Sequence, residues 1–155
     1  MSITTTTHLN FRGDARAALE FYRTVFGGDL SIATYGDFGM PPELPGAGNV
    51  VFGQVETADG FRVMAYDIPG QSGGSASSAG STRREGGVTV TDQPFFVAVR
   101  GGTLAEVQAY WAALSVGAVI VEPLAASAWS PGFGMLTDGF GVTWILDVAA
   151  PSSAE

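Results

Sequence analysis

The sequence predicts an α+β fold made of two tandem βαβββ modules. Two observations carry this prediction. A pattern of strand, helix, glycine stop and three further strands occurs twice in the same order. In addition, the phrase Asp59-Gly60-Phe61-Arg62-Val63 returns near the end of the second copy as Asp138-Gly139-Phe140-Gly141-Val142. We therefore expect one structural domain with modules at residues 1–68 and 93–149, a joining segment at 69–92 and a tail at 150–155.

The first module is predicted to start with a strand at residues 3–12, which ends at Gly13. A helix follows from Asp14 to Phe26, because Asp14 can cap it and Gly27-Gly28 can end it. Between this helix and the next module, strands are expected near 29–36, 49–57 and 61–67. An irregular segment with three prolines, Gly36 to Gly48, separates the first two of them.

The second module restarts with a strand at residues 95–99 and a helix that begins at Thr103. Glu106 completes a capping-box pattern with Thr103, and Gly117 ends the helix. Further strands are expected near 118–122, 132–137 and 142–148. The helix pair Phe21-Tyr22 matches Tyr110-Trp111 at a spacing of 89 residues, whereas the Asp-Gly-Phe phrases are 79 residues apart. The longer Pro-rich segment of the first module accounts for this difference.

The joining segment is dominated by Gly and Ser, with one charged patch, Arg83-Arg84-Glu85. A stretch with so little apolar surface has little to offset the entropy that is lost when it becomes ordered. We expect a linker or mobile loop over residues 69–92.

The composition excludes several classes of protein. Of 155 residues 46% are hydrophobic, but no apolar run reaches the roughly 18 residues that cross a membrane. The net charge is −8 and only Arg83 and Arg84 are adjacent basic residues, so nucleic acid is not expected as a partner. The chain has no Cys, which excludes disulfides and thiolate chemistry. Its beginning lacks the pattern of a signal peptide, and we expect a cytoplasmic protein.

Two stretches carry a family resemblance. Residues 8–22, HLNFRGDARAALEFY, with Val25-Phe26-Gly27-Gly28 after them, resemble the opening of a PhnB-like protein. Trp129, residues 133–138 and residues 140–144 resemble its end. PhnB-like proteins belong to the vicinal oxygen chelate superfamily of glyoxalases, bleomycin-resistance proteins and extradiol dioxygenases. The resemblance implies paired modules whose curved mixed sheets enclose a cleft, commonly in a homodimer.

Metal-dependent members of that superfamily hold the ion with His and Glu from the first and last strand of each module, which suits a divalent ion with open positions. The resemblance places His8 at the first-strand position of the first module. It places Phe95 or Phe96 at that position in the second module. Tyr66 and Ile145 fall at the last-strand positions when the Asp-Gly-Phe phrases are aligned.

Neither Phe nor Ile can bind a metal, and Asp67 and Asp147 are expected on the opposite face of their strands. One His is too few donors, so we expect no metal and no other cofactor. Asn10, two residues after His8, should face the same way.

Large side chains near the strand ends are candidates for lining a ligand site. With the first-strand pair, the candidate ligand-binding residues are His8, Asn10, Tyr35, Met64, Tyr66, Trp129, Phe133 and Trp144. For the six large side chains the alternative is a place in the core or in a dimer interface, and for His8 it is an exposed position or a place on an edge strand. Arg62 and Arg100 could clamp an anionic ligand or could be ordinary paired charges. Asp37 and Glu43 lie in the Pro-rich segment, which could be a lid or a plain exposed loop.

Three functions remain open. The first is a metal-free protein that binds a small molecule in the cleft, of the bleomycin-resistance type. The second is a metal-independent enzyme of the lyase, isomerase or oxygenase type, with His8 or Tyr66 as acid or base. The third is an interaction or structural role. The glycine-rich stretches do not connect a strand to a helix, so phosphate-binding loops are not expected.

Overall fold

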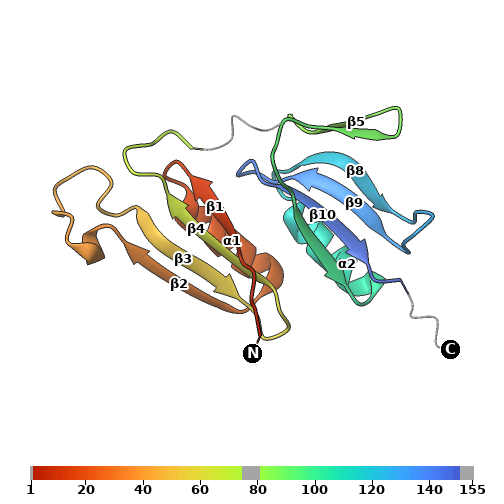
Figure 1. The fold of residues 1–155 in the computed structure, drawn as a ribbon, viewed down its shortest axis with the longest axis horizontal. Coiled ribbons are helices and arrows are strands. Elements are labelled where there is room, and N and C mark those ends of the chain that lie inside the picture. Colours follow the sequence, from red (N-terminus) through yellow and green to blue (C-terminus); the bar gives the residue numbers. More distant parts are fainter. Residues whose placement is uncertain (1, 75–80, 151–155) are drawn as a thin grey trace. The chain divides into compact units, whose positions relative to one another are not determined.

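The computed structural model describes residues 2–74 and 81–150, and the chain divides into two compact units, Met1–Ser75 and Ala76–Glu155. Each unit contains one βαβββ module, as predicted (Figure 1). The first unit contains, in order, β1 (Thr7–Phe11), α1 (Ala15–Phe26), β2 (Asp29–Thr34), the short 3-10 helix η1 (Gly36–Phe38), β3 (Val50–Glu56) and β4 (Arg62–Asp67).

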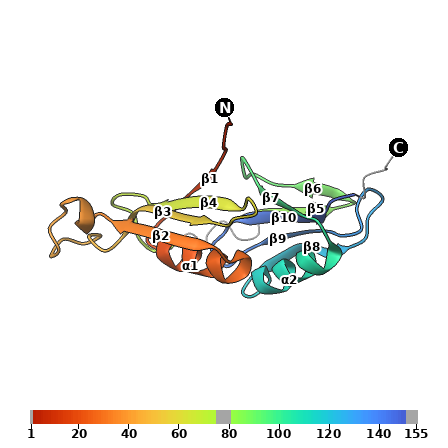
Figure 2. The ribbon, with the colours of Figure 1, turned by 90° about the horizontal axis from the view of Figure 1, so that it is seen from below.

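The first sheet has the strand order β1-β4-β3-β2, with β1 parallel to β4 and the other pairs antiparallel. Helix α1 covers one face of this sheet (Figure 2). Leu19 of α1 is fully buried and lies against Gly53 of β3, where an added Cβ would stand 2.3 Å from its Cδ1. A glycine at this position therefore lets the helix pack closely on the strand.

The start of α1 is held by the last strand of its module rather than by Asp14, which makes no side-chain capping bond. The carboxylate of Asp67 accepts the backbone N–H groups of Gly13 and Ala15 at 2.9 and 3.0 Å. Its other oxygen accepts the N–H of Val50 at 2.8 Å. The sequence pattern had the correct helix start but the wrong capping residue, because the capping carboxylate comes from a distant strand.

The second unit contains β5 (Arg83–Glu85), β6 (Val88–Val90), β7 (Val97–Gly101), α2 (Leu104–Leu114), β8 (Val119–Ala125), β9 (Phe133–Thr137) and β10 (Thr143–Val148). Its four-stranded sheet has the order β7-β10-β9-β8, with β7 parallel to β10. The Thr103 hydroxyl accepts the N–H of Glu106 at 3.2 Å, which confirms the predicted cap of α2.

Strands β5 and β6 form a hairpin that sequence analysis did not anticipate within residues 69–92. The hairpin lies on the side of the second sheet opposite α2 (Figure 2). Arg84 donates to Glu122 of β8 and to Thr89, and the Thr89 hydroxyl lies 3.7 Å from the sulfur of Met135. These polar contacts order a segment whose apolar content alone predicted no structure.

The last hairpins of the two modules show that the Asp-Gly-Phe phrases are not equivalent. The N–H of Thr57 donates to the carbonyl of Phe61, and the N–H of Asp138 donates to that of Val142. Thr57 therefore corresponds to Asp138, at a spacing of 81 residues rather than 79. The left-handed glycines agree with this register, because Gly60 and Gly141 both have positive φ, at 111° and 88°.

Candidate functional site

The face of the first sheet opposite α1 carries half of the predicted ligand-binding residues. Leu9 and Ala65 are paired, buried and on the α1 side. Successive side chains alternate between faces, so the neighbours of these residues point the other way. In register on this open face are the pairs His8 with Met64 and Asn10 with Tyr66. The structure thus brings four of the eight predicted residues together, and none of the four is buried.

The ring of His8 is oriented by its neighbour. Its Nδ1 lies 3.0 Å from Oδ1 of Asn10. In the tautomer whose Nδ1 donates to this amide oxygen, Nε2 is an acceptor. The ring also meets Tyr66 edge-on, with 5.2 Å between ring centroids. An exposed imidazole held in this way can accept a hydrogen bond, or a proton, from a bound molecule.

Tyr35 lies at the end of the same sheet but is committed to a structural bond. Its hydroxyl donates to the backbone carbonyl of Asp67 at 2.6 Å. Burial, and then the nearby Tyr66 and Asp67, raise the pKa of Tyr35 above its usual value. The Tyr35 phenol therefore stays protonated at neutral pH and serves as a donor rather than a base.

The open face continues across β3 with polar residues that sequence reasoning missed. Gln54 is in register with Met64, and its amide donates to Glu56 at 2.8 Å. Glu56 is also paired with Arg62, the residue opposite it on β4. The period-two alternation of β3 could have placed Gln54 and Glu56 on one face, but only the register shows that Glu56 is neutralised by Arg62.

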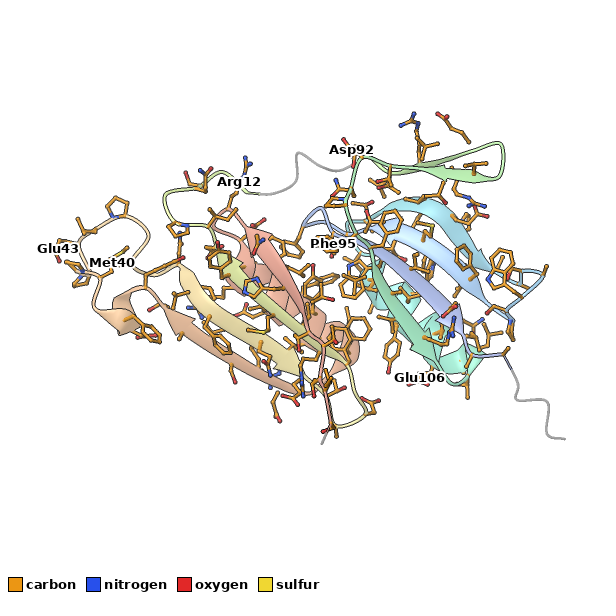
Figure 3. All side chains as sticks on the ribbon, in the orientation of Figure 1. Arg12, Met40, Glu43, Asp92, Phe95 and Glu106 are labelled. Carbon is orange, nitrogen blue, oxygen red and sulfur yellow. The ribbon has the colours of Figure 1, made fainter. Side chains whose placement is uncertain are left out.

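The first strand of the second module does not lie where the sequence predicted it, at residues 95–99. Strand β7 begins at Val97, so Phe95 and Phe96 precede it, and Phe95 is half exposed (Figure 3). Buried Gly101 lies against α2, which places Ala98 and Arg100 on the open face.

Asp147 also lies on the open face, in register with Arg100 and Phe133. The expectation that Asp147 points away is wrong, because it is two residues from Ile145 and so shares its face. Its partner by the corrected spacing of 81 residues is Tyr66. Asp67, by contrast, is buried on the α1 side of its sheet, as expected.

The three remaining predicted residues belong to the second module, where Trp144 lies apart from Trp129 and Phe133. Trp144 is fully buried on the α2 side of its sheet, and its indole N–H donates to Asp138 at 2.9 Å. The expected role of Trp144 in lining a ligand site does not fit this position. Trp129 is 62% exposed in the loop before β9 and meets Phe133 edge-on, with 5.4 Å between ring centroids.

The Pro-rich segment of the first module forms η1 and the loop that leads to β3. Met40 and Glu43 lie in the loop between η1 and β3 (Figure 3). Asp37 accepts the backbone N–H of Thr34 at 2.8 Å, and Thr34 in turn accepts the N–H of Asp37. Asp37 thus stabilises the turn in which it stands.

The donor set does not fit the divalent metal of the superfamily. Within residues 2–74 and 81–150, no three His, Cys, Asp or Glu side chains group so that they could hold an ion. In the first module His8 is accompanied by Met64 and Asn10, and Glu56, a carboxylate on the same face, is paired with Arg62. In the second module Asp147 is engaged by Arg100, whose positive charge opposes a metal ion.

Comparison with known proteins shows the family of the chain. The family model of the Glyoxalase/Bleomycin resistance protein/Dioxygenase superfamily matches residues 6–146. Comparison with curated proteins found no match. In the part of the chain that the structure describes, no helix is both long and apolar enough to span a membrane.

Several solved structures share the fold. Protein PA1353 from Pseudomonas aeruginosa is 24% identical, with a TM-score of 0.72 over 95% of this chain and 98% of its own. A PhnB protein from Bacillus cereus, described as a putative 3-demethylubiquinone-9 3-methyltransferase, is 25% identical, with a TM-score of 0.63 over 95% and 100%. A glyoxylase/bleomycin resistance protein/dioxygenase domain from Frankia sp. EAN1pec is 10% identical, with a TM-score of 0.64 over 98% and 95%.

Proposed function

Because the chain belongs to the glyoxalase/bleomycin resistance protein/dioxygenase superfamily, we propose that it binds a small organic molecule on the open face of its first sheet. The cluster of His8, Asn10 and Tyr66 carries this proposal. The resemblance implies a ligand at these strand positions. The side chains present there offer hydrogen bonds and aromatic surface instead of a metal-binding set.

The cluster favours a ligand with a hydroxyl or N–H group attached to an apolar body. The Nε2 acceptor of His8 would receive the hydrogen bond of that group. The ring of Tyr66 and the thioether of Met64 supply adjacent apolar surface, and Gln54 lies next to Met64 across the strands. Such a mixture of one oriented polar group and several apolar ones is typical of small-molecule sites.

Binding without a resident divalent metal is part of the proposal, and the donor set supports it. Titration of the purified protein with Zn²⁺ or Mn²⁺ alone tests it directly by calorimetry. We expect no stoichiometric binding of either ion. A tight one-to-one complex that His8→Phe abolishes would contradict this part of the proposal.

A metal-independent enzyme is the second candidate, and the hydrogen bond between His8 and Asn10 favours it. An imidazole that is oriented by a hydrogen bond at Nδ1 presents Nε2 in the position that a general base needs. The nearby phenol of Tyr66 could return a proton. In this case His8→Phe would abolish turnover of a substrate, whereas in a pure binding protein it would lower affinity alone.

Phenol is a suitable minimal probe, since it joins one donor to an apolar ring. We expect a titration followed by ¹H–¹⁵N correlation spectra to shift backbone signals of β1 and β4 saturably. His8→Phe keeps a ring but removes the acceptor, and Tyr66→Phe removes the phenol oxygen, so both should weaken binding. Tyr110→Phe, on α2 of the other module, is the matched control. Unchanged binding in His8→Phe would overturn the proposed site.

A further inference from the structure

A row of side chains crosses the face of the second sheet opposite α2, beside the part of that face on which the β5–β6 hairpin lies. Arg100 of β7, Asp147 of β10 and Phe133 of β9 are in register, one on each of three neighbouring strands. Trp129 extends the row, because its ring meets that of Phe133 edge-on. Strands are about 4.8 Å apart, so the backbones of Arg100 and Phe133 stand roughly 10 Å from each other.

Arg100 is held at one end of this row in a fixed orientation. Its Nε and Nη2 donate to the two carboxylate oxygens of Asp147 at 3.1 and 2.9 Å. These bonds use two of the five N–H donors of a guanidinium group, and three remain. The Arg100 side chain is 69% exposed, whereas that of Asp147 is 14% exposed. The accessible part of the pair therefore offers hydrogen-bond donors, and a ligand must supply the acceptor.

The other end of the row is aromatic. Trp129 is 62% exposed although it is the largest kind of apolar side chain, and its ring contacts that of Phe133 at a steep angle. An exposed indole face offers a flat surface to another ring. Between the two ends the row contains only the carboxylate of Asp147, whose oxygens Arg100 already engages.

We propose that this row binds an organic carboxylate that has an aromatic body. The carboxylate accepts the remaining N–H donors of Arg100 in the planar geometry that favours bidentate pairing. The aromatic body packs on Trp129 and Phe133. The Arg100–Asp147 pair has no net charge and the chain carries −8, so short hydrogen bonds, not a long-range field, provide the attraction.

This site goes beyond the function proposed above and does not depend on it. It lies on the sheet of the second module and uses neither His8 nor Tyr66. The two sites also differ in ligand chemistry. The first takes a hydrogen-bond donor, and the second takes an anionic acceptor.

Phenylbutyrate and its neutral amide, phenylbutyramide, are the probes, because they share an aromatic body and differ in the charged group. Binding is followed by the indole N–H signal of Trp129 in ¹H–¹⁵N spectra, assigned from the spectrum of Trp129→Phe. The indole of Trp144, which is buried and bonded to Asp138, is the internal reference. We expect a saturable shift of the Trp129 signal and affinity roughly tenfold higher for the carboxylate.

Variants assign the effect to Arg100. Arg100→Gln should equalise the affinities of the two probes, and Trp129→Ala should weaken both. Arg83→Gln is the matched control. Like Arg100, Arg83 is an exposed arginine paired with a carboxylate, but its partner is Glu85 in the hairpin. His8→Phe should leave phenylbutyrate binding unchanged, which separates this test from that of the first site.

Three results would overturn the proposal: no shift of the Trp129 signal, equal binding of both probes to the wild-type protein, or a carboxylate preference that survives in Arg100→Gln. If Arg100→Gln does not fold, Arg100→Lys decides. Lysine keeps the charge but lacks the planar fork, so the preference should fall in that variant. A preference undiminished in Arg100→Lys would also count against the site.

Discussion

The carboxylate of Asp67, the last residue of β4, accepts the N–H of Ala15, the first residue of α1. This bond joins the two ends of the first module, and the same carboxylate accepts the backbone N–H groups of Gly13 and Val50. We predict that Asp67→Asn lowers the free energy of unfolding by about 3 kcal/mol, since the amide keeps one acceptor oxygen and its NH2 group cannot accept the backbone N–H on the other side. Urea unfolding followed by circular dichroism measures the change.

Asp147→Asn is the control for this substitution. Asp147 is also the carboxylate of a last strand, but its bonds are to an exposed guanidinium. Removing such a pair should change the free energy of unfolding by less than about 1 kcal/mol. Equal losses in the two variants would show that the bonds to backbone N–H groups are not what makes Asp67 important.

The close packing at Gly53 predicts that a larger side chain there destabilises the fold. In Gly53→Ala the added Cβ would stand 2.3 Å from Leu19 Cδ1 and 3.1 Å from the carbonyl oxygen of Ala65. Overpacking of this kind should lower the free energy of unfolding by about 2 kcal/mol. Gly48→Ala, where an added Cβ meets nothing within 4 Å, is the matched control and should be close to neutral. A double variant that also shortens Leu19 to Val should recover part of the loss.

The lowered pKa of Asp37 predicts that the stability of the folded state depends on pH in the acid range. Hydrogen bonds from the backbone of Thr34 and then from its side chain lower the pKa of Asp37, with a smaller contribution from Arg16. A lowered pKa in the folded state stabilises the fold above the carboxyl's ordinary pKa, and this contribution is lost as the pH falls through the folded value. Carbon-detected titration of the Asp37 carboxyl should give a pKa below its ordinary range.

Thr34→Val separates the two bonds at Asp37. This substitution removes the hydroxyl and keeps the backbone N–H, which is the larger cause. The pKa should move toward its ordinary value without reaching it. A pKa unchanged by Thr34→Val would mean that the side chain has no part in the shift.

The β5–β6 hairpin offers a pair of matched arginines. Arg84 contacts Glu122 outside the hairpin, whereas Arg83 contacts only Glu85 within it among the ion pairs of the described residues. Arg84→Ala should increase amide hydrogen exchange in residues 83–90 about fivefold, as expected for the loss of roughly 1 kcal/mol. Arg83→Ala should leave the exchange nearly unchanged, and similar rates in both variants would contradict the anchoring role of Arg84.

Some of the candidate site followed from the sequence because strand periodicity is a local property. His8 and Asn10 are two residues apart, so any strand that contains both places them on one face. Their pairing with Met64 and Tyr66 required the parallel register of β1 and β4. Trp144 shows the limit of such reasoning, since its place near the Asp-Gly-Phe phrase does not reveal which face of β10 is covered by α2.

The duplicated βαβββ plan, the two helices and the family followed from the sequence alone, because periodicity, glycine stops and motifs are local features of a chain. The tertiary structure decided the register of the repeat, the capping of α1 by Asp67 and the position of the β5–β6 hairpin. These depend on hydrogen bonds between residues far apart in the chain. A shift of two residues keeps every side chain on its face, so the pattern alone did not distinguish Ile145 from Asp147 as the counterpart of Tyr66.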